Sequence, residues 1–261
     1  MPFLHRPGCD LYYEVTGAGP AVVFAHGLGG NHLSWWQQVP HLARRYTCVT
    51  FSHRGFGPSR EDPGGPGPAA FVDDLGALLD RLGVGDVRLV AQSMGGWTCL
   101  GYALRARGRV RGLVMSSTFG SLADPELDAL LVTRRPRAWG DQTSGVHPAA
   151  GERMAREQPA LHFLYREIDA LNAVDRGAVL SELLALRTTP SDALAGLSVP
   201  VLCVVGEEDA VIPPDSVAIL ASRIPGARLV RVPAAGHSVY FERAGAFNRL
   251  LDDFLSEDGR P

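Results

Sequence analysis

The chain has 261 residues, of which 46% are hydrophobic and 20% charged, a balance typical of a globular protein with one mixed core. A net charge of −3 argues against nucleic acid or an acidic membrane surface as a partner. Lysine is absent, which excludes Schiff-base chemistry and a Walker A phosphate loop, because both need that side chain.

The cysteines and the hydrophobic runs bear on the compartment. Cys9, Cys48, Cys99 and Cys203 form no CxxC pair, two of them fall in strand-like runs and one in the predicted helix after position 93, so we expect buried free thiols and a cytoplasmic location. Residues 1–6 lack an apolar signal core, and no apolar run approaches the ~20 residues that a membrane span needs. We therefore expect no membrane partner.

The first part of the chain predicts a hairpin followed by buried strands. Residues 3–5 and 11–15 flank a Pro-Gly turn, and residues 21–25 form an unbroken apolar run, as in a parallel sheet covered on both faces. A short helix is expected to begin at Trp35, and a second buried strand is expected at 47–51.

A glycine-rich loop, residues 26–30, follows the strand at 21–25. A dinucleotide-binding G-x-G-x-x-G motif fails here, because His32 replaces the third glycine and Ser52 and His53, not an acid, follow the next strand. The alternative is that the loop offers a backbone N–H to a developing oxyanion. His26 is either a second base or, as we expect, a brace for this loop.

The stretch at 90–96, Val-Ala-Gln-Ser-Met-Gly-Gly, lies between a strand-like run at 87–90 and a helical pattern at 97–107. Ser93 has Ala91 two residues before it and Gly95 two residues after it, the outline of a nucleophile elbow. The alternative is an ordinary helix N-cap. Ala91 stands where the strict pattern has glycine, and its methyl group is expected to crowd the turn.

The middle of the chain predicts a helix at 71–82, a strand at 110–115 and then a change of character. The strand at 110–115 ends in Ser116-Ser117-Thr118, without a carboxylate. Residues 119–197 are predicted to form a helical lid inserted into a core made of residues 1–118 and 198–261. Strand-like runs stop where this lid begins. The lid arginines, Arg134, Arg135, Arg137, Arg153 and Arg156, are expected on its solvated face, or one of them meets an anionic substrate.

The C-terminal part resumes the strand–helix alternation, with strands at 200–205 and 227–232 and helices at 215–223 and near the end. Loops that follow strands of a parallel sheet meet at its carboxyl edge, where ligands bind. Two such loops carry Asp209 and His237. A serine needs a base, and a histidine base needs an orienting carboxylate, so Ser93, His237 and Asp209 form a candidate triad, with Glu207 and Glu208 as rival acids. The histidines lack HxH and HExxH spacing, so we expect no metal and no cofactor.

These segments resemble α/β-hydrolase-fold serine hydrolases over nearly the whole chain. The resemblance is carried by residues 26–29, 54–59, 93–96, 206–209 and 236–237. Within that group, the chain is similar to bacterial carboxylesterases, enol-lactonases and cofactor-free perhydrolases. It implies an α/β fold with a mostly parallel central sheet flanked by helices, and an oxyanion hole made by the N–H groups of Leu28 and Met94. The departures are Ala91 and Ser52, where many relatives carry Gly and Asp.

The expected function is hydrolysis of a carboxylic ester or lactone of a small molecule through an acyl-enzyme on Ser93, by a monomer or homodimer. The alternatives are a carbon–carbon bond hydrolase acting on a dienol-type acid, with Arg134, Arg137 or Arg153 as its anion site, and a slow-turnover receptor or natural-product tailoring protein on the same fold. From loop position we expect the substrate pocket to be lined by Leu28, His26, His32, Trp36, Trp97, Phe119, Val211 and Tyr240.

Overall fold

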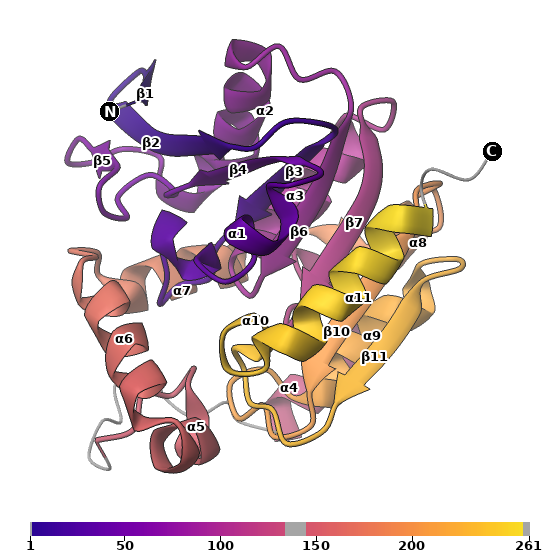
Figure 1. The fold of residues 1–261 in the computed structure, drawn as a ribbon. Coiled ribbons are helices and arrows are strands. Elements are labelled where there is room, and N and C mark those ends of the chain that lie inside the picture. The colour runs from indigo at the N-terminus through magenta and orange to yellow at the C-terminus, as the bar shows by residue number, and fades with distance from the viewer. Residues whose placement is uncertain (1, 134–144, 258–261) are drawn as a thin grey trace.

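The computed structural model describes residues 2–133 and 145–257 (Figure 1). A twisted central sheet runs through the molecule, with helices against both of its faces, as the sequence predicts. Within the described residues, no helix combines the length and the apolar character that crossing a membrane requires.

Nine strands of the described chain form the main sheet, in the order β1-β2-β4-β3-β6-β7-β10-β11, with β5 paired to β2. β2 pairs antiparallel with β1, β4 and β5, and the remaining neighbours in the sheet are parallel. The strands are β1 (Phe3–Arg6), β2 (Cys9–Thr16), β3 (Ala21–Ala25), β4 (Thr47–Phe51), β5 (Arg60–Glu61), β6 (Val87–Gln92), β7 (Val110–Ser116), β10 (Val201–Gly206) and β11 (Arg228–Val232).

The helices lie between the strands and in the insertion. They are η1 (His32–Trp35), α1 (Val39–Leu42), η2 (Gly67–Ala70), α2 (Phe71–Arg81), α3 (Gly95–Arg105), α4 (Pro125–Thr133), α5 (Gly151–Glu157), α6 (Pro159–Ala170), α7 (Arg176–Ala185), α8 (Ser191–Leu194), α9 (Pro214–Arg223), α10 (Val239–Glu242) and α11 (Ala244–Glu257).

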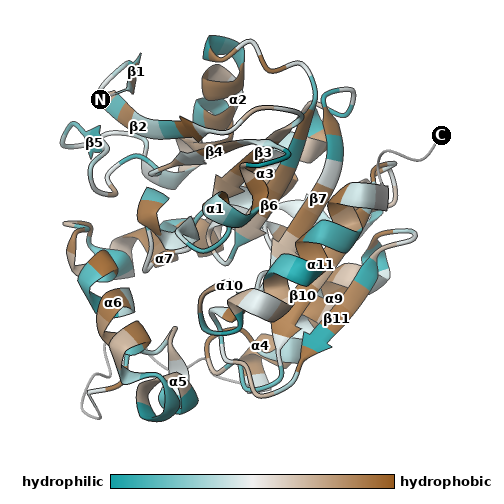
Figure 2. Cartoon of the chain, viewed as in Figure 1, coloured by the Kyte–Doolittle hydropathy of each residue, from teal (hydrophilic) through white to brown (hydrophobic). Residues whose placement is uncertain are grey.

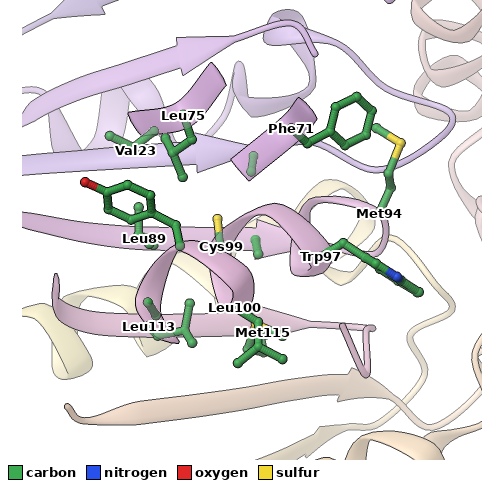
Figure 3. Packing of buried hydrophobic residues seen from close by; sticks show 14 of the residues in the cluster. Val23, Phe71, Leu75, Leu89, Met94, Trp97, Cys99, Leu100, Leu113 and Met115 are labelled. Carbon is green, nitrogen blue, oxygen red and sulfur yellow. The ribbon is translucent and has the colours of Figure 1, made fainter. Parts of the chain in front are cut away.

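The parallel strands are apolar on both sides because each sheet face has its own helical cover. In β6, Leu89 belongs to the cluster under α2, α3 and α9, whereas the next residue, Val90, belongs to the cluster under η1 and α11. This alternation is the two-residue period of a strand. Figure 2 shows the central strands as predominantly hydrophobic, and Figure 3 shows Leu75 and Leu100 among the side chains packed over one face.

The insertion predicted at 119–197 falls between β7 and β10, which are neighbours in the sheet. Its two ends are joined by a small parallel pair, β8 (Leu122–Ala123) with β9 (Thr189–Pro190). Asp124 caps α4, since its Oδ1 accepts from the N–H groups of Glu126 and Leu127. The sequence predicts no strands in this segment, so β8 and β9 are a departure from the prediction. A two-residue strand has too few positions to show an alternating pattern in the sequence.

Candidate active site

Ser93 lies at the junction between β6 and α3 in a strained backbone conformation. Its φ is +49°, in the left-handed region that a non-glycine residue rarely adopts. A hydrogen bond from its N–H to Ser116 O, 2.9 Å long, holds the turn to β7. Gly95 is required beside it, because a Cβ there would lie 2.2 Å from Ala25 O. The predicted sharp turn is therefore present, with the Ser93 side chain only partly buried.

Ala91 fits this turn as a fully buried core residue. It pairs in register with Ala25 of β3 and Met115 of β7. Its methyl group joins the cluster that includes Leu89, and Ser93 keeps its left-handed conformation two residues later. The crowding expected from the sequence is accommodated by the packing between β3 and β7.

His237 and Asp209 form a buried pair at the ends of β11 and β10. His237 Nδ1–H donates to Asp209 Oδ2 at 2.9 Å, and both side chains are almost fully buried. Asp209 Oδ1 also accepts the N–H groups of Val211 and Ile212, at 2.9 and 2.8 Å. These two bonds fix the carboxylate, which in turn fixes the imidazole with its Nε2 turned away from the acid.

The rest of the predicted relay is not closed in this structure. Among the described residues, His237 Nε2 has no hydrogen-bond partner, Ser93 included. Catalytic hydrogen bonds are often long without substrate and tighten when it binds. The rival acids Glu207 and Glu208 are exposed, and Glu208 pairs with Arg153. Of the three carboxylates considered, Asp209 is the one against His237.

The glycine loop approaches the elbow closely. A Cβ on Gly27 would lie 3.1 Å from Ser93 Cβ and 1.9 Å from Gln92 Oε1, so only glycine fits without a shift. In the described part of the chain, the N–H groups of Leu28 and Met94 are bonded to no acceptor. Both residues line one cavity with Ser93, so two free donors flank the candidate nucleophile.

His26 braces this loop from beneath. Its Nδ1–H donates to Gly27 O at 2.8 Å, and its Nε2 accepts the backbone N–H of His53 at 2.9 Å. The His53 ring continues the chain to Thr98 Oγ1 at 2.9 Å. Burial lowers the pKa of His26 to about 3 and that of His53 well below its ordinary value, so both rings stay neutral. This geometry favours the brace over the second base.

A cavity of about 650 Å³ opens at Ser93. Its walls come from the strand-end loops and from the insertion, and they are apolar apart from Ser93, Asp128 and Arg187. The lining residues are Leu28, Ser93, Met94, Trp97, Phe119, Asp128, Leu131, Val132, Leu180, Leu183, Leu184, Arg187, Val211 and Ile212. Leu28, Trp97, Phe119 and Val211 were predicted at this pocket from loop position.

Four other residues predicted at the pocket lie elsewhere, and these predictions are wrong. His26 lies behind the loop, and His32 bonds Ser52 through its ring Nδ1. Trp36 is 44% exposed and packs its ring against Phe241. Tyr240 is fully buried beneath η1 and α6. Each lies in or near a strand-end loop, but its side chain contacts residues outside the cavity lining.

The arginines predicted as a possible anion site separate into two groups. Arg134, Arg135 and Arg137 lie outside the described residues. Arg153 binds Glu208 and Glu157 near the surface and does not line the cavity. The arginine on the cavity wall is Arg187, which the sequence did not single out, because one arginine after an amphipathic helix carries no distinguishing pattern.

Glu242 is a second residue that the sequence did not single out. It is 4% exposed, and its Oε1 accepts the N–H of Gly236 at 2.5 Å, directly before His237. Burial raises its pKa from 4.5 to about 7, with nearby Asp209 adding to the rise and the Gly236 N–H opposing it. The loop that carries His237 is therefore held by a carboxyl group that titrates near neutrality.

Comparison with known proteins supports the same fold. The model of the alpha/beta hydrolase fold family matches residues 20–244. The chain belongs to this family. It is 26% identical to the putative carbamate hydrolase RutD of Azorhizobium caulinodans, covering 98% of this chain and 99% of that protein.

Two solved structures of this α/β-hydrolase family share the whole architecture. One, Est816, is described as an N-acyl homoserine lactone degrading enzyme; it has a TM-score of 0.82 and 28% identity, over 97% of this chain and all of that one. The other is the enol-lactonase of Burkholderia xenovorans LB400, with a TM-score of 0.78 and 26% identity, over 98% of this chain and all of that one. The predicted α/β-hydrolase fold and the family resemblance are confirmed.

Proposed function

We propose that this α/β hydrolase cleaves a carboxylic ester or lactone of a small organic molecule through an acyl-enzyme on Ser93. The supporting observation is the strained Ser93 on the floor of an apolar cavity, beside a buried His237–Asp209 pair. Strain at a single polar residue of this kind persists only where the surrounding structure enforces it, and it clusters at reactive sites.

The proposed chemistry assigns a step to each side chain. His237 Nε2 takes the proton of Ser93 Oγ as the oxygen attacks the carbonyl carbon, and Asp209 stabilises the imidazolium through Nδ1. The N–H groups of Leu28 and Met94 bind the tetrahedral oxyanion. His237 then gives the proton to the leaving oxygen, and a water activated by the same nitrogen releases the acid.

The apolar walls define what the cavity accepts. Trp97, Phe119 and the leucines of α7 offer an apolar surface for an alkyl or aryl group, and they exclude water from the reacting centre. The proposed substrate therefore has a hydrophobic body next to its ester or lactone bond.

A fluorophosphonate probe and a set of p-nitrophenyl esters test the proposal. We expect covalent labelling of Ser93 in the wild type, found by peptide mass spectrometry, and a loss of at least about 10³-fold in ester hydrolysis in Ser93→Ala. Ser117→Ala is a matched control, since Ser117 is a buried serine that also has positive φ but lines no part of the cavity. Absent labelling together with unchanged hydrolysis in Ser93→Ala would sink the proposal.

A substrate panel separates ester, lactone, carbamate and dienol-acid cleavage. The panel is run beside Ser93→Ala, so that only Ser93-dependent turnover is counted.

We also propose a cytoplasmic location, which the four free, buried cysteine thiols support, and a monomer or homodimer with no nucleic-acid or membrane partner. Sedimentation of the purified chain measures the oligomeric state.

A further inference from the structure

Arg187 is a cation on the wall of an otherwise apolar cavity. Its side chain is 14% exposed and follows α7 in the insertion. Burying a guanidinium beside apolar side chains is costly unless its donors and its charge are matched. The contacts of Arg187 therefore indicate which kind of ligand group this part of the cavity wall can bind.

The guanidinium is held in place but only partly satisfied. Its Nε–H donates to Leu122 O at 3.1 Å, and its Nη2 donates to Asp128 Oδ1 at 2.6 Å. Its Cζ lies over the Phe119 ring, 5.3 Å from the ring centroid, a cation–π contact that favours this position of the guanidinium. Among the described residues, no acceptor is bonded to its Nη1, which leaves a pair of oriented donors unused.

The counter-charge of Arg187 comes from Asp128, which also lines the cavity. The Asp128 side chain is 59% exposed, so water screens its field, whereas the guanidinium faces low-dielectric surroundings that screen its field far less. Asp128 is the only acid that lines the cavity within the described residues. Water therefore screens the field of Arg187 inside the cavity less than that of Asp128.

A chain of ring contacts links this wall to the elbow. Trp97, one helical turn after Ser93, meets Phe119 edge-on with centroids 5.4 Å apart, and Phe119 in turn contacts Arg187. One cavity thus presents a candidate nucleophile and, across two apolar rings, a fixed cation. A ligand that satisfies both has a reacting carbonyl, an apolar middle and an anionic end.

We propose that Arg187 anchors a carboxylate-binding subsite, so that the substrate carries a carboxylate remote from the bond that is cleaved. This inference rests on the proposed esterase or lactonase function. Nη1 donates to the carboxylate, Phe119 and Trp97 contact the apolar middle of the molecule, and Asp128 keeps the guanidinium plane in position.

Pairs of esters that differ only in a terminal carboxylate or carboxamide test the subsite. On the acyl side the pair is monoethyl adipate and ethyl adipamate, and on the alcohol side it is 6-butyryloxyhexanoate and its primary amide. We expect the wild type to prefer the acid in at least one pair by about tenfold or more in kcat/KM, as for a hydrogen bond to a charged group. Shorter and longer diacid monoesters then measure the distance between the two ends.

Three variants assign that preference to Arg187. In Arg187→Gln the acid-to-amide ratio of kcat/KM falls to about one, and in Asp128→Asn it rises, because a competing negative charge is removed. Arg223→Gln is the matched control: Arg223 also pairs with α4, through Glu126, but it lines no part of the cavity, so the ratio stays at the wild-type value. Far-ultraviolet circular dichroism checks that each variant is folded.

Failure of this inference and failure of the proposed function give different results. Ser93-dependent hydrolysis with equal rates for acid and amide, or a preference that survives Arg187→Gln, overturns the subsite alone. If no ester is hydrolysed, calorimetric titration of Ser93→Ala with adipamate and with adipamide still decides: tighter binding of the acid that is lost on adding Arg187→Gln supports the subsite, and equal binding rejects it.

Discussion

The strand-end loops and the insertion build opposite halves of one cavity, and they differ in how their side chains are held. The loops place Ser93, His237 and Asp209 in fixed positions, through backbone strain and buried hydrogen bonds. The insertion contributes apolar side chains from α4 and α7, several of them exposed at the mouth, such as Val132, Leu180 and Leu184.

The difference separates two kinds of dependence. Interactions that hold reacting atoms act mainly in the transition state and change kcat, whereas contacts along an apolar wall bind substrate and transition state alike and change KM. Changes in the loops should therefore act on kcat and changes in the insertion on KM. A loop variant that changes mainly KM, or an insertion variant that changes mainly kcat, would contradict this division.

The largest expected effect is that of Asp209→Asn. The amide keeps an acceptor for the Val211 and Ile212 N–H groups, but it presents N–H to His237 Nδ1 and thereby favours the wrong tautomer. We expect kcat to fall by about 10⁴-fold with little change in KM, measured on the best ester of the panel.

Glu208→Gln is the control for this prediction. Glu208 is exposed and pairs with Arg153, so kcat should stay within about twofold of the wild type, as for surface charges generally. A large loss in Glu208→Gln with a small one in Asp209→Asn would move the acid role to the neighbouring carboxylate.

A smaller effect, on stability, is expected at Glu242. Because its pKa rises from 4.5 to about 7 on folding, the folded state holds a proton that the unfolded chain releases. The stability from this proton is complete below pH 4.5 and is lost as the pH rises through 7. Glu242→Gln keeps an acceptor for Gly236 N–H without ionising, so between pH 5 and pH 8 it should gain about 2 kcal/mol over the wild type.

Urea unfolding at several pH values measures this difference. Glu167→Gln, which changes an exposed carboxyl of α6, is the control and should show no such trend. A difference between Glu242→Gln and the wild type that does not vary with pH would mean that Glu242 stays in one ionisation state throughout. The prediction places a carboxyl group that titrates near neutrality against the loop that carries His237.

The sequence predicted the loop half of the cavity better than the insertion half, for a physical reason. Elbow, glycine loop and strand-end acid each need a particular residue type at a particular turn, as Gly95 and Gly27 do here, so the pattern itself carries the geometry. The parallel sheet followed from apolar runs such as residues 201–205, which are buried on both sides.

The insertion carries no comparable constraint. The apolar spacing of α7 predicts a helix with one buried face, but it does not say whether that face meets a core or a cavity. For the same reason the sequence misplaced Trp36 and Tyr240 and passed over Arg187 and Glu242: burial of a loop or helix side chain depends on what packs against it from far along the chain. Two-residue strands such as β8 and β9 leave no period to detect.

The smallest expected effect is at Trp97, where the two halves meet. Its indole Nε1–H donates to Leu183 O at 2.9 Å, joining α3 of the core to α7 of the insertion, and its ring lines the cavity. Trp97→Phe removes this bond between the two halves, although Leu183 O still accepts the N–H of Leu186, and it takes apolar surface from the cavity wall. We expect KM for hydrophobic esters to rise by roughly fivefold while kcat changes little, because losing about 1 kcal/mol of apolar contact with the substrate corresponds to a factor of about five.

Trp36→Phe is the matched control for Trp97→Phe. Trp36 is exposed and lines no part of the cavity, so its KM and kcat should stay near those of the wild type. An effect of Trp97→Phe on kcat as large as that on KM would mean that the insertion also positions the reacting atoms. In that case the wall would act through α3, whose first turn carries Gly95 beside Ser93, and the division between a catalytic half and a binding half would not hold.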